Sequence, residues 1–181
     1  PRSRIGWQWV DAAVLSGVPV ANLRVRTIYG LARDALAGTS QSLKLLPSTA
    51  GPLLIERASS RLPPNGYLTS LEPGFGLFER AYDTVRALRI AGLEPDEVHG
   101  AAFEVDVKGD ELRLLLDAYV QQLRGAGFRD HADLLREARA SLPAGWPDGC
   151  TVLVPSDLPE RLGRLERELL DAVPQECVRM L

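Results

Sequence analysis

Helical apolar spacing covers most of this chain, whereas strand-like runs are few, short and far apart in sequence. Over 75–91 and 108–123, apolar residues recur at three- and four-residue intervals, as they do on one face of a helix. Only 20–28, 151–154 and 178–181 are typical of strands. Two of these runs flank a long helical block, and the simplest assembly unites them in one sheet. We therefore expect a mainly α fold: a helical domain with a small parallel β-sheet fragment.

Proline and glycine divide the helical block into separate helices. The strongest turn signal is Pro63-Pro-Asn-Gly66, and Gly92 and Pro95 mark a second break. Asp130, with Asp133 three residues on, predicts the start of another helix through a capping box. Further helices are predicted over 5–15, 29–36, around 53–58, after Asp130 to about 138, and over 158–173, with loops over 39–48 and 143–149.

The segment from Leu23 to Leu36 joins a β-branched run to the start of a helix. Such a junction presents unpaired backbone N–H groups and the positive end of the helix dipole, which together favour a phosphate. An aromatic ring and guanidinium groups add the parts that contact single-stranded nucleic acid. The alternative is an ordinary strand–helix joint with solvent-facing arginines, and these residues alone favour it. The candidate contacts are Arg24, Arg26, Thr27, Tyr29 and Arg33.

Part of this segment resembles a conserved motif of a helicase family. The run Thr27-Ile-Tyr-Gly-Leu-Ala32 is similar to the Thr-Phe-His-Gly-Leu-Ala segment of superfamily 1 helicases of the UvrD/RecB type, which lies beside their single-stranded DNA track. Tyr29 stands where that family usually has histidine. Downstream, 75–98 and 112–136 resemble the helical insertion of AddB-like helicase–nuclease proteins.

The resemblance implies a partial P-loop-type motor domain interrupted by its insertion. The motor segment would comprise 1–38 and 150–181, and the all-helical insertion 39–149. The implied function is a non-catalytic, DNA-contacting scaffold in an ATP-dependent DNA helicase–exonuclease that acts in double-strand break repair and recombination. The implied partners are single-stranded DNA and either the rest of the parent chain or a partner helicase subunit. In that role Thr27 would donate its hydroxyl to a phosphate and Tyr29 would stack on a base.

The nucleotide-binding parts of such a motor are missing from this sequence. A phosphate-binding loop needs Gly-x-x-x-x-Gly-Lys-Ser/Thr, and the only lysines here are Lys44 and Lys108, outside any such motif. In such a motor, a strand of this kind ends in acidic residues that hold magnesium. Here Pro155 follows the strand at 151–154 in place of the first carboxylate, and a single carboxylate, Asp157, comes two residues later. We expect no ATP hydrolysis by this chain and no cofactor in it, with ATP and Mg²⁺ needed only by the full-length parent.

Other catalytic or metal-binding sets find no support. The two cysteines, Cys150 and Cys177, are not spaced with histidines as zinc ligands are, and we expect both to be buried and reduced. His99 follows several carboxylates, a pattern more typical of a helix surface than of a metal site. His131 is predicted to be an exposed residue in the first turn of its helix. No catalytic residue is therefore assigned.

Charge is divided unevenly along the chain. Residues 1–61 carry eight basic and three acidic groups, whereas 62–181 carry thirteen basic and twenty-one acidic groups. Nineteen of the twenty-one cations are arginine, which suits phosphate recognition but also follows from GC-rich coding. The basic first part favours DNA contact. The acidic remainder favours the alternative function, a helical protein-interaction module that docks a partner subunit.

We expect neither a membrane span nor a secretory signal peptide in this sequence. No run approaches the ~18 uninterrupted apolar residues that a membrane span needs. The start has arginines but no apolar stretch followed by a small-residue cleavage site, so it is unlike a signal peptide. Reduced cysteines favour a cytoplasmic location. The start at Pro1 and the apolar end at Leu181 suggest a piece cut from a longer protein.

Overall fold

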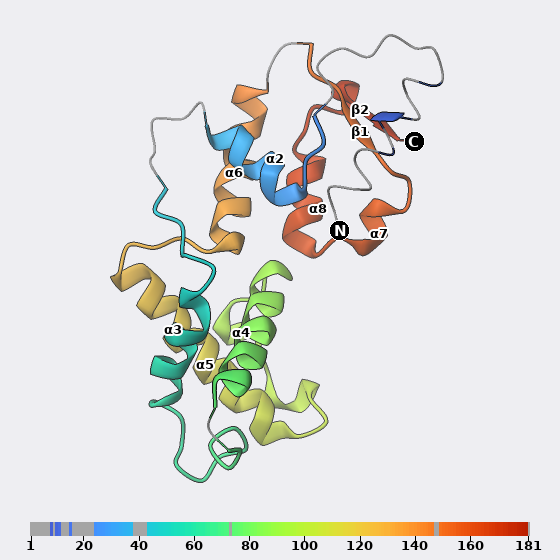
Figure 1. The fold of residues 1–181 in the computed structure, drawn as a ribbon. Helices are drawn as coiled ribbons and strands as arrows, with labels where there is room; N and C mark the ends of the chain where they lie inside the picture. Colours follow the sequence, from blue (N-terminus) through green and yellow to red (C-terminus); the bar gives the residue numbers. More distant parts are fainter. Residues whose placement is uncertain are drawn as a thin grey trace.

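The computed structural model describes residues 24–37, 43–72, 74–146 and 149–180, together with Gln8, Val10, Asp11 and Leu15. These residues form a mainly helical structure with one small sheet, which confirms the expected fold class (Figure 1). The α-helices are α2 (Ile28–Leu36), α3 (Ala50–Ser59), α4 (Phe75–Ile90), α5 (Asp106–Gly125), α6 (His131–Gly145), α7 (Leu158–Arg161) and α8 (Arg164–Asp171). Short 3₁₀ turns lie at Pro95–Glu97, Gly100–Ala102 and Gln175–Cys177.

The sheet consists of two parallel strands, β1 (Val152–Val154) and β2 (Val178–Met180). Val152 pairs with Val178 and Val154 with Met180, and the crossover between the strands contains α7 and α8. Both strands were expected from their β-branched residues. The strand predicted over 20–28 is wrong for its described part, because 24–27 form no strand and Ile28 already begins α2. The rest of that prediction, and the helix predicted over 5–15 apart from four residues, lie outside the described residues.

A first hydrophobic core lies between α3, α4 and α5. Its fully buried members include Ile55 of α3, Val85 of α4, and Leu115, Leu116 and Tyr119 of α5. The apolar residues of the amphipathic patterns thus face one another, as their periodicity predicts. Burial and the nearby Asp130 carboxylate raise the pKa of the Tyr119 hydroxyl above its usual value.

A buried carboxylate fixes the loop that joins α3 to α4. Glu111 of α5 is 2% exposed and accepts hydrogen bonds from the backbone N–H groups of Tyr67 and Leu68 at 2.6 and 2.7 Å. Gly66 must be glycine here, because a Cβ atom would overlap the Glu111 carboxylate. The predicted turn at 63–66 is therefore held against the first core.

A second core unites α2, α6, α8 and the sheet. Ala32 of α2 packs with Leu134, Leu135 and Ala138 of α6 and with Leu169 of α8. Figure 1 shows this group apart from α3, α4 and α5. The assignment of 39–149 to a helical insertion stays a prediction, and the structure adds that α6, within that range, packs with α2 and α8.

Two predicted boundaries near the end of the chain are wrong. The helix expected over 158–173 is interrupted at Leu162 and Gly163, where the chain extends before α8 begins. Gly163 is the N-cap of α8 and donates its N–H to Glu166 at 2.9 Å, and it lies so close to α4 that a Cβ atom would stand 2.7 Å from Ile90 Cγ2. The helix after Asp130 continues through Pro143 to Gly145, where a loop was predicted.

The prediction that both cysteines are buried is wrong for Cys150. Cys150 is exposed, whereas Cys177 is partly buried, and both are free thiols.

Within the described residues, no helix is both long and apolar enough to cross a bilayer.

Candidate nucleic-acid interface

Thr27 begins α2 as its N-cap. Its backbone is extended, and its Oγ accepts a hydrogen bond from the Gly30 N–H at 3.0 Å. This is the usual way in which a threonine satisfies one of the free N–H groups at a helix start. The hydroxyl hydrogen takes no part in that bond, so Thr27 can cap α2 and still donate to an acceptor outside the protein.

The three candidate arginines are exposed. Arg26 donates from Nε to Asp34 Oδ2 at 2.6 Å, and both side chains are about half exposed, so the pair is worth only about 0–1 kcal/mol. Within the described part of the chain, Arg24 and Arg33 make no ion pair or side-chain hydrogen bond. Asp34 is therefore the one carboxylate that competes with an external phosphate for these arginines in the described structure.

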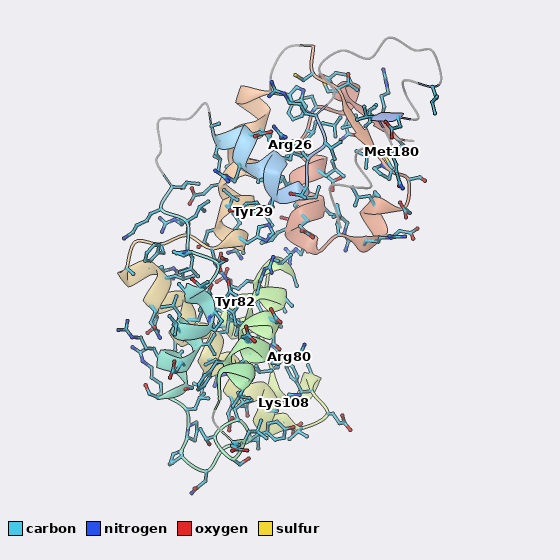
Figure 2. The ribbon with its side chains drawn as sticks, viewed as in Figure 1. Arg26, Tyr29, Arg80, Tyr82, Lys108 and Met180 are labelled. Carbon is cyan, nitrogen blue, oxygen red and sulfur yellow. The ribbon has the colours of Figure 1, made fainter. Side chains whose placement is uncertain are left out.

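Tyr29 is half-buried rather than free in solvent. Its ring meets the His131 ring edge-on, with centroids 4.9 Å apart and planes 81° from parallel, and it packs against the second core. Figure 2 labels Tyr29 on α2 and Arg26 just before the start of that helix, which packs beside α6 and α8. One part of the Tyr29 ring is thus occupied by the protein, and only its remaining edge or face can meet a base.

His131 lies in the first turn of α6, as predicted, but the prediction that it is exposed is wrong. Tyr29 of α2 and Arg86 of α4 cover it, with Arg86 Nη2 3.5 Å from Nδ1, while its Nε2 atom is buried without a hydrogen-bond partner in the described structure. Burial, and next the Arg86 charge, lower the pKa of His131 below its ordinary value of 6.5. Its neutral form is the one that fits this position.

Four of the five candidate residues, Arg24, Arg26, Thr27 and Tyr29, lie at the start of α2, whereas Arg33 lies in its last turn. Arg24 and Arg33 are exposed and have no ionic partner among the described residues, Arg26 is paired, Thr27 caps the helix, and Tyr29 is partly covered. The exposed arginines and the first N–H groups of α2 can attract an anion. The tyrosine can offer part of a stacking surface.

The carboxylates near His99 serve the fold. Glu94 and Glu97 form the capping box of the Pro95–Glu97 turn, and Glu94 also accepts from Arg136 at 2.7 Å. His99 is exposed beside them. Among the residues that the structure describes, no group of three or more potential metal ligands comes together.

The structure brings together a second group of arginines that the sequence patterns did not indicate. Arg89, Arg124 and Arg129 come from α4, α5 and the turn before α6, and they line one open depression. Each arginine alone is unremarkable in the sequence. One sign of this group lies in the sequence: Arg124 is the basic residue in the last turn of α5, directly before the glycines at 125 and 127.

Comparison of the chain with protein-family models, with curated proteins and with solved structures gave no significant match. The likeness to helicases of the UvrD/RecB type therefore rests on the residues quoted above.

Proposed function

We propose that this chain is a DNA-contacting scaffold of an ATP-dependent DNA helicase–exonuclease that acts in double-strand break repair and recombination. The observation that carries the proposal is the exposure of Arg24, Arg26 and Thr27 at the start of α2, next to its first N–H groups. The likeness of 27–32 to a helicase segment beside the DNA track supports the same assignment.

In this proposal the junction holds the backbone of a single strand. Arg24 and Arg33 neutralise phosphates, Thr27 donates its free hydroxyl hydrogen to a phosphate oxygen, and the open part of Tyr29 supports a base. Arg26 shifts from Asp34 to a phosphate, because an exposed ion pair costs little to exchange. ATP and Mg²⁺ act elsewhere in the parent protein, and a cytoplasmic location belongs to the same proposal.

The experiment is fluorescence anisotropy with a labelled oligothymidylate over a series of salt concentrations. Affinity should fall as salt rises, with a slope of about 0.7 per phosphate contacted on a single strand. Arg24→Ala/Arg26→Ala should lower the affinity and reduce the slope by about 1.4. Arg80→Ala/Arg113→Ala removes two exposed arginines from α4 and α5 and is the matched control.

A gain-of-function variant sharpens the test. Asp34→Asn removes the carboxylate that pairs with Arg26 while leaving the size of the side chain nearly unchanged. It should raise the affinity for the oligonucleotide, and the gain should vanish in Arg26→Ala/Asp34→Asn. An unchanged salt slope in Arg24→Ala/Arg26→Ala would remove the DNA role of this junction.

The second candidate is a protein-interaction module, and the sheet favours it. Parallel sheets are usually covered on both faces, and two strands alone are marginal. Leu153 of β1 and Met180 of β2 are nevertheless 48% and 54% exposed, as expected if a partner subunit or the rest of the parent chain covers them. Tight binding of a neighbouring domain, lost in Leu153→Ser, together with no specific DNA binding, would favour this module.

A further inference from the structure

An open depression of about 340 Å³ lies where α4, α5 and α6 meet. Its volume is at the lower end of the range of small-ligand sites, which suits a single nucleotide unit rather than a bulky ligand. Three guanidinium groups and two aliphatic side chains dominate its wall. The lining residues are Arg89, Val120, Leu123, Arg124, Arg129 and Asp133.

Arg89 gives the depression a fixed wall. It is 2% exposed and donates from Nε to Asp130 at 3.0 Å and from Nη2 to Asp133 at 2.6 Å. Asp133, the acidic residue of the lining, is also held by the capping box of α6 and lies within 3.8 Å of Arg136. Asp133 shares these two arginines with Asp130, which pairs with Arg89, and with Glu94, which contacts both.

Within the described structure, Arg124 and Arg129 have fewer ionic partners than Arg89. Arg124 is exposed in the last turn of α5 and has no ion pair or side-chain hydrogen bond within the described structure. Arg129 donates from Nε to Glu137 at 3.0 Å and from Nη1 to the Phe128 carbonyl at 3.3 Å, while its Nη2 forms no hydrogen bond with the residues that the structure describes. The Lys44 ammonium stands 4.1 Å from the centre of the neighbouring Phe128 ring and adds a further cation near this turn.

We propose that this depression binds the phosphate of a nucleotide unit in single-stranded DNA. Arg124 and the free edge of Arg129 hold the phosphate, because a guanidinium fork matches phosphate oxygens. Val120 and Leu123 supply the apolar floor for the sugar or base. The proposal rests on the proposed function in that it assigns the same ligand, but its residues are separate from those of α2.

The experiment compares Arg124→Gln/Arg129→Gln with Arg57→Gln/Arg113→Gln. The control removes two exposed arginines from α3 and α5 that do not line the depression. With a labelled oligothymidylate, we expect about a tenfold loss of affinity and a salt slope smaller by about 1.4 for the depression variant alone. Circular dichroism of both variants verifies that the helices are retained. An equal loss in both variants, or none in either, would overturn the proposal.

Two further experiments distinguish a free nucleotide from DNA as the ligand, and the depression from the α2 junction as the binding surface. Titration calorimetry with inorganic phosphate and with thymidine monophosphate, on the natural chain and on Arg124→Gln/Arg129→Gln, tests for a free-nucleotide site. Binding of the mononucleotide but not of the oligonucleotide overturns the DNA assignment. If Arg24→Ala/Arg26→Ala keeps full affinity while the depression variant loses it, the α2 junction fails and the depression stands. If the depression variant keeps full affinity while Arg24→Ala/Arg26→Ala loses it, the proposal for the depression is overturned.

Discussion

Arg89 of α4 and Asp130 at the start of α6 form a buried ion pair, with Nε 3.0 Å from Oδ2 and side chains 2% and 7% exposed. Burial opposes the charged guanidinium, but the hydrogen bond and charge of Asp130, with those of Asp133, outweigh it and raise the Arg89 pKa. Because α4 belongs to the first core and α6 to the second, this pair joins the two.

Removing one partner of this pair should be strongly destabilising. Arg89→Met leaves Asp130 and Asp133 without their buried cation, and loss of one partner of a buried ion pair typically costs about 3–5 kcal/mol. Urea unfolding measures the loss. Arg136→Gln breaks the partly exposed contact to Glu94 and serves as the control, with an expected loss of no more than about 1 kcal/mol. Similar small losses in both variants would contradict a buried pair.

Gly51 should tolerate no side chain, although it lies inside a helix. Alanine normally favours a helix over glycine by about 1 kcal/mol. Here a Cβ atom on Gly51 would overlap the Tyr82 ring of α4, so we expect Gly51→Ala to destabilise the fold by about 1–3 kcal/mol. Gly76→Ala, in α4 with open space around it, should change stability by no more than about 1 kcal/mol. Thermal unfolding of the two variants decides the point.

His131 should make the fold less stable in mild acid. Burial, and next the Arg86 charge, lower its pKa in the folded state, so the unfolded chain binds more protons between that value and 6.5. The contribution to stability is complete above pH 6.5 and is lost as the pH falls toward the folded pKa, by at most about 1.4 kcal/mol per pH unit. The groups facing the ring are Arg86 of α4, Tyr29 of α2, Glu166 of α8 and Asp130.

Unfolding of His131→Gln between pH 7.5 and 5.5 measures this contribution. The variant should lose the part of the pH dependence that His131 supplies, whereas His99→Gln, which removes an exposed histidine, should retain it. If the natural chain and His131→Gln show the same loss of stability over this range, the proton is not taken up at His131.

The sequence correctly predicted those helices and strands whose signals lie within the element itself. The amphipathic spacing of 75–91 and 108–123 led to α4 and α5, and the pairing of Asp130 with Asp133 led to the start of α6, because these signals lie within one element. The closeness of Gly163 to Ile90 was missed because the two residues lie more than seventy positions apart in sequence. Likewise, nothing near His131 in sequence indicates that Tyr29 covers it.

The candidate site shows the same limit. Arg24 to Arg33 were grouped because they are neighbours in sequence; Arg24, Arg26, Thr27 and Tyr29 do lie together at the start of α2, but the helix carries Arg33 to its last turn. The partner of Arg26, Asp34, was not foreseen, since pairing required the turn from 24–27 into α2. The depression lined by Arg89, Arg124 and Arg129 needs three elements to meet, so no local pattern predicts it.

Thr27 allows the capping and DNA roles of the α2 start to be separated. Aspartate is as good an N-cap as threonine or better, and its charge is favourable at a helix N-terminus, so Thr27→Asp should keep stability unchanged or raise it by up to about 1 kcal/mol. The same carboxylate repels a phosphate, so affinity for a single strand should fall. Thr27→Ser keeps both the cap and the donor and should bind like the natural chain. Urea unfolding and anisotropy on the same preparations test both effects, and undiminished DNA affinity in Thr27→Asp would place the strand away from this helix start.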